Sequence, residues 1–159
     1  MSESRDIDFS VIEELLGVML PRDYKELASF YPALEFDGFL VVSLPDPGAE
    51  TSFVAGVQSR LDILEDLVEA GMTEGYVGHP AVNGLLPWAE SLSGDGFYWR
   101  RSSGKAEEWP VVVGTRNQDW WEFPGGALAF LGGLIDGSIE RLGLPTSVPS
   151  RHPRIRPFV

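Results

Sequence analysis

The chain contains no cysteine, which excludes disulfide bonds, zinc–thiolate sites and a cysteine nucleophile. It also lacks a long apolar run, because its longest mostly apolar stretch, residues 125–135, is 11 residues long. A membrane-spanning helix needs about 20. The first eight residues are acidic and polar, without the basic start and apolar core of a secretory signal. We therefore expect no membrane association and a cytoplasmic location, which the absence of cysteine suits.

Sequence motifs of common catalytic and cofactor sites are missing too. There is no Walker loop, no dinucleotide fingerprint and no Gly-x-Ser-x-Gly elbow. His79 and His152 both precede proline in expected loops and, without cysteine, make a poor zinc site. Asp95 lies in a Gly-Asp-Gly sequence, which is typical of a turn. We predict a protein that is not an enzyme and binds no metal and no cofactor. The alternative, loop carboxylates acting as acid and base, would need a pocket with two carboxyl groups of raised pKa.

Positive charge is scarce and unevenly placed. The net charge is −12, and the residues before Gly143 hold all 24 acidic but only 9 of the 12 basic side chains, a net charge of −15. Arg151, Arg154 and Arg156 follow without any acidic residue. A body this acidic repels phosphate backbones, which argues against nucleic-acid binding, and attracts a basic protein partner. Solubility alone is the other explanation of the charge.

A length of 159 residues indicates one domain. We expect residues 1–7 to be frayed, the domain to span residues 8–144, and residues 145–159 to form a proline- and arginine-rich tail. Helical spacing of apolar residues, with capping and proline signals, predicts four helices: residues 11–16, 21–31, 59–70 and 127–135. Alternation, β-branched runs and turn signals predict strands at residues 36–44, 85–92, 97–101, 109–114 and 120–123, with Asp37-Gly38 marking an early turn or bulge.

The order of these motifs resembles the SMI/KNR family of the SUKH superfamily, named after yeast cell-wall regulators. A helix pair with Leu-Pro-Arg-Asp-Tyr comes first. A Leu-Pro-Trp strand, a Gly-Asp-Gly-Phe-Tyr-Trp hairpin and a Trp-Pro-Val-Val-Val strand follow, and an aromatic strand then leads into Ala-Phe-Leu-Gly-Gly-Leu-Ile-Asp-Gly. The resemblance covers residues 11–137. Tyr31-Pro32-Ala33-Leu34 stands where many members carry Asn-Gly, and the tail after Leu144 lies outside the pattern.

The resemblance implies an α+β domain with a mixed, mostly antiparallel sheet flanked by helices. It also implies a non-catalytic protein without a cofactor. In bacteria such domains resemble immunity proteins, which bind and silence a toxin, so the expected partner is a basic toxin domain. The alternative is a regulatory or scaffold module that binds a cellular protein unrelated to toxins, as the fungal relatives do.

All five tryptophans lie within 34 residues, on successive expected strands. We expect Trp88, Trp99 and Trp109 to fill the core, because their strands are rich in other apolar residues. Trp120 and Trp121 are adjacent, so in a strand they point to opposite faces. The pair is a candidate partner-binding site, because an exposed tryptophan is a frequent hot-spot residue. Burial of both in the core is the alternative.

Four carboxylates lie in or beside the loops that join the last three strands: Glu107, Glu108, Asp119 and Glu122. They form either a solvated face or an acidic patch that covers a basic toxin cleft and speeds association. For the carboxylates of the third helix we expect a solvated face. The predicted partner-binding site therefore combines these four loop carboxylates with Trp120 and Trp121.

Overall fold

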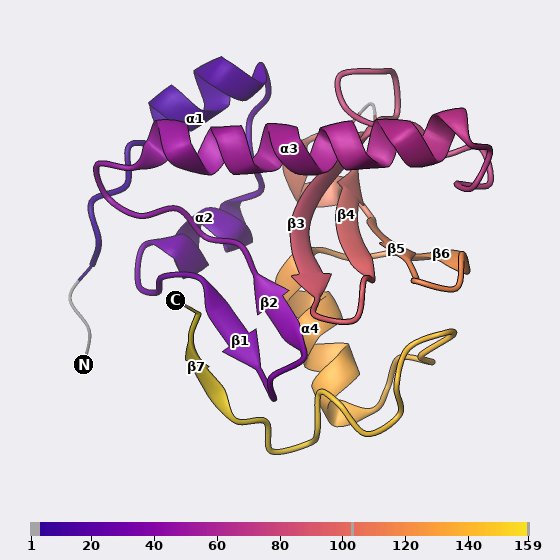
Figure 1. Ribbon diagram of the computed structural model, residues 1–159. Helices are drawn as coiled ribbons and strands as arrows, with labels where there is room; N and C mark the ends of the chain where they lie inside the picture. The colour runs from indigo at the N-terminus through magenta and orange to yellow at the C-terminus, as the bar shows by residue number, and fades with distance from the viewer. Residues whose placement is uncertain (1–3, 103, 159) are drawn as a thin grey trace.

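Seven strands form one antiparallel sheet, with helices on both of its faces (Figure 1). The computed structural model describes residues 4–102 and 104–158. The strands are β1 (Leu34–Phe36), β2 (Leu40–Val42), β3 (Leu85–Ser91), β4 (Gly96–Arg100), β5 (Val111–Gly114), β6 (Trp120–Phe123) and β7 (Ile155–Pro157). Their order across the sheet is β6-β5-β4-β3-β2-β1-β7, and each neighbouring pair is antiparallel. The predicted α+β fold is thereby confirmed.

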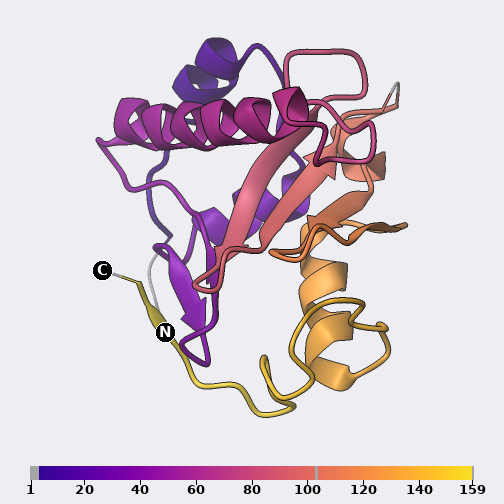
Figure 2. The same ribbon diagram turned by 45° about the vertical axis from the view of Figure 1, so that its right-hand side comes forward.

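Within the described residues, four α-helices and one 3₁₀ turn accompany the sheet: α1 (Phe9–Leu16), α2 (Arg22–Ala28), α3 (Glu50–Glu69), η1 (Ala106–Glu108) and α4 (Ala127–Asp136). The long helix α3 crosses in front of the upper ends of β3 and β4 in Figure 1 and packs against α1. Helix α4 lies behind the sheet, as the turned view of Figure 2 also shows, and packs against α2. One face of the sheet is therefore covered by α3 and the other by α4.

The aromatic part of the core lies between the sheet and the pair α2 and α4, while α1 and α3 add aliphatic residues to the same core. Trp88, Trp99 and Trp109 are buried there, as their strand context predicts. The Trp88 ring packs on Trp99 with ring centroids 6.0 Å apart and meets Phe130 of α4 edge-on at 6.1 Å. Tyr24 of α2 contacts Trp99 edge-on at 5.0 Å. Aromatic residues of alternate strand positions thus join both helices to one face of the sheet.

The single strand predicted at residues 36–44 is wrong, because two strands occupy this region. Asp37 and Gly38 both adopt positive φ angles, 57° and 63°, and reverse the chain between β1 and β2. Aspartate and glycine tolerate such angles better than most residues. The early turn signal was therefore the dominant local feature.

The predicted start of the third helix, at Ser59 or Asp62, is also wrong, because α3 begins at Glu50. Its first half contains Thr51, Ser52 and Gly56, which are weak helix formers. Val54 and Val57 are nevertheless buried, on the same stripe as the predicted Leu61 and Leu64. Tertiary packing of this stripe, including contacts with α1, overrides the weak local propensity.

Both chain ends make specific contacts within the described residues. In the N-terminal segment expected to fray, the Arg5 guanidinium donates to the carbonyl oxygens of Ala28 and Tyr31 and pairs with Asp46. In the tail that follows residue 144, β7 adds to the sheet beside β1. The arginine-rich tail therefore lies against the acidic body.

Candidate functional site

A pair of glycines shapes the face of the sheet that α3 crosses. Gly96 of β4 and Gly114 of β5 are direct partners in the sheet register. A Cβ atom on Gly114 would lie 2.6 Å from the Trp120 ring, and one on Gly96 would collide with the Tyr98 ring. The two rings are tilted by only 21°, with centroids 6.1 Å apart. The missing side chains thus let two aromatic rings lie close to the backbone.

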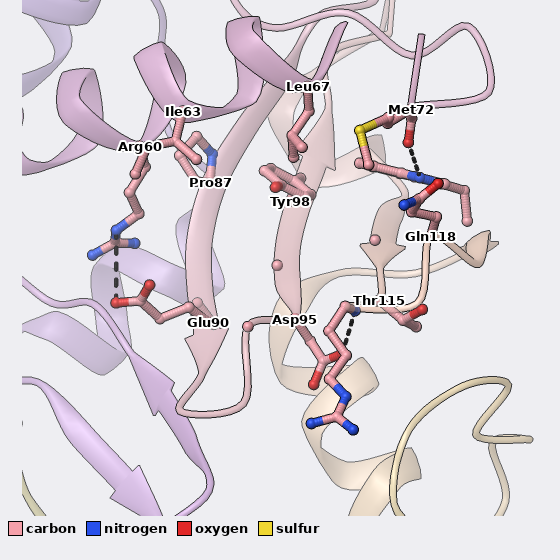
Figure 3. Close-up of a pocket in the computed structure, with 16 residues that line it drawn as sticks. Arg60, Ile63, Leu67, Met72, Pro87, Glu90, Asp95, Tyr98, Thr115 and Gln118 are labelled. Carbon is pink, nitrogen blue, oxygen red and sulfur yellow. Dashed lines mark hydrogen bonds and ion pairs between the residues drawn. The ribbon is translucent and has the colours of Figure 1, made fainter. Parts of the chain in front are cut away.

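These rings form the floor of a groove of about 300 Å³ between α3 and the sheet. Figure 3 shows Leu67 descending from α3 toward Tyr98, Ile63 beside Pro87, and Met72 on the other side of Leu67. Ile63 is 62% exposed although it is apolar. The groove therefore has an aromatic floor and an aliphatic wall that is open to solvent.

Charged side chains also line the groove. The Arg60 guanidinium donates to the Ser43 hydroxyl, and its Nε lies 4.0 Å from Oε1 of Glu90 (Figure 3). Asp95 also lines the groove; it is buried and accepts hydrogen bonds from the Ser91 hydroxyl (2.6 Å) and the Arg116 backbone N–H (2.8 Å). Asp95 therefore ties together the turns that follow β3 and β5, in keeping with the turn role expected of it.

The Trp120 ring is held in place from a second side. Its indole N–H donates to the Met72 carbonyl at 3.0 Å, and the Tyr76 ring lies 5.5 Å from it. The Tyr76 hydroxyl donates to Glu122 at 2.8 Å, and the Arg100 guanidinium binds the same carboxylate through two hydrogen bonds of 2.9 and 3.1 Å. Four side chains from three parts of the chain therefore form one ordered polar and aromatic surface next to the groove.

The electrostatics of this surface follow from these contacts. Burial opposes the charge of Glu122, but hydrogen bonds from Arg100 and Tyr76 outweigh it and lower the pKa of the carboxyl group. Burial, together with the bond to Glu122, raises the pKa of Tyr76 to about 12. Burial alone is the main cause that raises the pKa of Tyr98, also to about 12. Both phenols are therefore neutral near pH 7, while Glu122 and Arg100 are charged.

Trp121 lies on the opposite face from Trp120, as their adjacency predicts. Its ring lies 6.0 Å from Phe130 of α4, and its indole N–H donates to the Leu142 carbonyl at 2.8 Å. Both tryptophans are partly buried. The structure thus separates the pair: Trp120 lines the groove, whereas Trp121 joins β6 to the segment after α4.

The four predicted carboxylates do not form one patch. Glu107 and Glu108 are exposed on η1, before β5 begins. Asp119 lies at the other end of β5, where its backbone N–H donates to the Thr115 hydroxyl oxygen at 3.0 Å and its carboxylate accepts from the same hydroxyl at 3.3 Å. Only Glu122 lies beside the groove, through its contacts with Tyr76 and Arg100. Of the predicted site, Trp120 and Glu122 come together.

Sequence reasoning missed Tyr98, Ile63, Leu67 and Tyr76 as residues of the groove and of the surface beside it. The alternation of β4 places Tyr98 opposite the buried Phe97 and Trp99, which was a usable signal for its face. The pairing of Gly96 with Gly114 depends on strand register, and the position of Tyr76 depends on a loop. Neither leaves a local pattern in the sequence.

Among the described residues, no group of three or more histidine, aspartate or glutamate side chains could hold a metal ion. The carboxyl groups with shifted pKa values, at Asp8, Asp37, Glu50, Glu122 and Asp136, are all shifted downward. A general acid at neutral pH needs the opposite shift. No described helix combines the length and apolar character needed to cross a membrane.

Comparison with known proteins supports the fold and the motif order. Searches of curated proteins and of solved structures gave no significant match. A family model described as SMI1-KNR4 cell-wall, SUKH_6, matches residues 6–127, which include α1 to β6 and the residues that line the groove. This match spans more than half of the chain. The chain therefore belongs to the SMI1-KNR4 family and carries a SUKH domain.

Proposed function

We propose that this protein is a non-catalytic immunity protein that binds a basic bacterial toxin domain and blocks its active site or substrate path. Family membership supports a protein-binding role in general. The observation that carries the proposal is the groove beside α3, which exposes apolar surface on a protein of net charge −12. Protein interfaces commonly combine an apolar centre with a polar edge.

The centre of the proposed interface is the exposed Ile63 with the partly buried Trp120 ring, and the buried Tyr98 ring supports them from beneath. Tryptophan and tyrosine are enriched among residues that dominate binding energy. Here both rings are fixed by the fold, since Trp120 is bonded to Met72 and Tyr98 packs over Gly96. A fixed ring loses little conformational freedom on binding, so its contacts contribute more to affinity.

The protein around the proposed interface is acidic. Helix α3 exposes four carboxylates outside the groove, Asp62, Glu65, Asp66 and Glu69, and the first two line a separate pocket with residues 77–81. Glu90 is half exposed at one end of the groove. With a net charge of −12, this surface attracts a basic toxin and steers its approach. The bound domain then occludes the toxin's cleft by its bulk.

Coexpression tests this function directly. A candidate toxin gene from the neighbourhood of this gene is induced in cells that also express the wild-type protein, the variant I63E or the control variant E107K/E108K. The proposal expects growth with the wild type and the control and arrest with I63E at equal protein levels. Arrest in the presence of the wild-type protein contradicts the immunity role.

The second candidate function is a scaffold or regulatory module, and the same groove would then bind a cellular protein. Gene context separates the two, because an immunity gene lies directly downstream of a toxin gene. A locus without a toxin gene, together with recovery of a regulatory complex on the wild-type protein but not on I63E, favours the scaffold role.

A further inference from the structure

The C-terminal strand β7 covers the edge of β1 through a small set of contacts. The strands pair over three residues, with Glu35 opposite Arg156. The Phe158 N–H donates to the Ala33 carbonyl and the Asp37 N–H donates to the Arg154 carbonyl, both at 2.8 Å. These bonds place β7 in register on the last strand of the sheet, at the opposite edge from the groove.

Two carboxylates of the β1 edge hold the tail by charge. The buried Glu35 carboxylate accepts two hydrogen bonds from the Arg156 guanidinium, at 3.1 and 2.9 Å. The Asp37 carboxylate accepts the backbone N–H groups of Ser150 (2.7 Å) and Arg154 (2.8 Å). These backbone bonds hold the pKa of Asp37 below its usual range.

Burial of the two strands is unequal. All three residues of β1 are buried, whereas all three residues of β7 are exposed. The apolar side chains of the tail gain little from packing, since Ile155 is 49% and Phe158 41% exposed. Segments held by few apolar contacts open locally at low free-energy cost. The tail therefore rests on main-chain and ionic bonds that another chain of the same chemistry can replace.

We propose that the β1 edge is a docking site for an extended basic segment of a partner protein, and that β7 occupies this site in the free protein as a displaceable strand. An added strand binds through main-chain hydrogen bonds and gains specificity from alternate side chains. Here Arg154 and Arg156 occupy alternate positions of the segment. Arg156 pairs with Glu35, and Arg154 lies beside Asp37.

The outer edge of β7 supports displacement over further addition. Residues 154 and 158 use their main-chain bonds toward β1, so Ile155 and Pro157 direct theirs outward. Proline has no N–H, so it interrupts the outer row of donors and discourages pairing there. A partner strand therefore reaches the sheet at this edge only by replacing β7. This inference does not require the partner to be a toxin.

Hydrogen exchange on the wild-type protein is the first test. The amides of Asp37 and Phe158 are compared with that of Ser43, which bonds to Trp88 inside the sheet at 3.0 Å. We expect the amides of Asp37 and Phe158 to exchange at least tenfold faster than the amide of Ser43. Equal protection at all three positions means that β7 opens only on global unfolding and overturns the proposal.

A peptide with the sequence of residues 150–158 is the second test, added to the full-length variant R154E/R156E, in which the chain's own tail is repelled from the edge. We expect the peptide to bind this variant at least tenfold more tightly than the wild type. A scrambled peptide of equal composition controls for charge attraction, and equal binding of both peptides to the folded variant contradicts the docking site.

A disulfide-linked variant is the third test, and it serves if the variant R154E/R156E does not fold. Residues 35 and 156 are direct partners, and the chain has no cysteine of its own. Pairs in this register suit a disulfide bond. Within the variant E35C/R156C, oxidation is expected to slow exchange at Phe158 at least tenfold relative to the reduced form. No change between the two forms means that β7 was already fixed, and it overturns displacement.

Discussion

Gly96 of β4 lies directly opposite Gly114 of β5, and the rings of Tyr98 and Trp120 occupy the space that two side chains would fill. This pair gives the groove its aromatic floor. It also links the sheet register to the proposed function, because a side chain at either position would lift a ring that the proposed interface uses.

The glycine pair predicts a measurable packing cost. Gly114→Ala places a methyl group 2.6 Å from the Trp120 ring and is expected to destabilise the fold by about 1–3 kcal/mol, a typical cost of overpacking. Urea unfolding measures the change. The control is Gly132→Ala in α4, where a Cβ meets no atom within 4 Å. That variant is expected to gain up to about 1 kcal/mol. Equal effects at the two positions would contradict the assigned packing.

The exposed carboxylates of α3 predict an effect on the rate of association with the toxin domain. Charge reversal in D62K/D66K is expected to slow association with the toxin domain about tenfold or more at low salt, with little change in the dissociation rate, because long-range attraction acts on the encounter. Surface plasmon resonance at several salt concentrations measures both rates. The variant E107K/E108K changes net charge equally but acts away from α3. An equal slowing by both variants would show that net charge alone matters.

His79 predicts a pH dependence of stability. Its ring is buried and its Nε2 lies 2.7 Å from the Leu16 carbonyl oxygen, which assigns the proton to that nitrogen. Burial lowers the pKa of His79 below 6.5. The unfolded chain then binds the proton more readily, so stability falls as pH decreases below about 6.5, by at most about 1.4 kcal/mol per pH unit.

Replacement of His79 by glutamine, which can still donate to Leu16, is expected to flatten the dependence between pH 7 and pH 5.5. Thermal unfolding across this range measures it. The control is His152→Gln, because that side chain is exposed. A wild-type slope that persists in His79→Gln would exclude His79 as its source.

Arg141 predicts the stability of the segment that leads from α4 to β7. Its guanidinium donates to four carbonyl oxygens: those of Leu134, Pro145, Val148 and Pro149. Lysine keeps the charge but cannot reproduce the planar set of donors. Arg141→Lys is expected to cost about 1.5–3 kcal/mol, the range for hydrogen bonds to a charged group. The exposed Arg151→Lys is the control, and equal unfolding free energies for the two variants would contradict the role of Arg141.

Local signals in the sequence predicted much of the fold. The Gly-Asp-Gly turn, the β-branched run before Gly114 and the glycine after α4 each act within a few residues, and these elements lie within two residues of their predicted positions. The turn between β1 and β2 had a visible signal too, but its strands are only three residues long. The strand β7 left no pattern, because its position depends on Glu35 and Asp37, more than 110 residues away.

The candidate site was less predictable for the same reason. Adjacency showed that Trp120 and Trp121 face opposite ways, but which face carries the groove depends on the placement of α3 and α4. Glu107 and Asp119 both lie within 15 residues of Trp120 in the sequence, yet they stand at opposite ends of β5. Charge and type of residue can be read locally, whereas convergence on one surface is set by register.

Isothermal titration with the purified toxin domain that the coexpression experiment identifies tests the proposed function most directly. Wild-type protein, Trp120→Ala and the opposite-face control Trp121→Phe are compared after near-UV circular dichroism has shown that each is folded. We predict one-to-one binding of the wild type and the control, and a loss of about 2 kcal/mol or more for Trp120→Ala, as for a hot-spot residue. Unchanged affinity in the folded Trp120→Ala variant, or no binding by the wild type, would contradict the proposed interface and function.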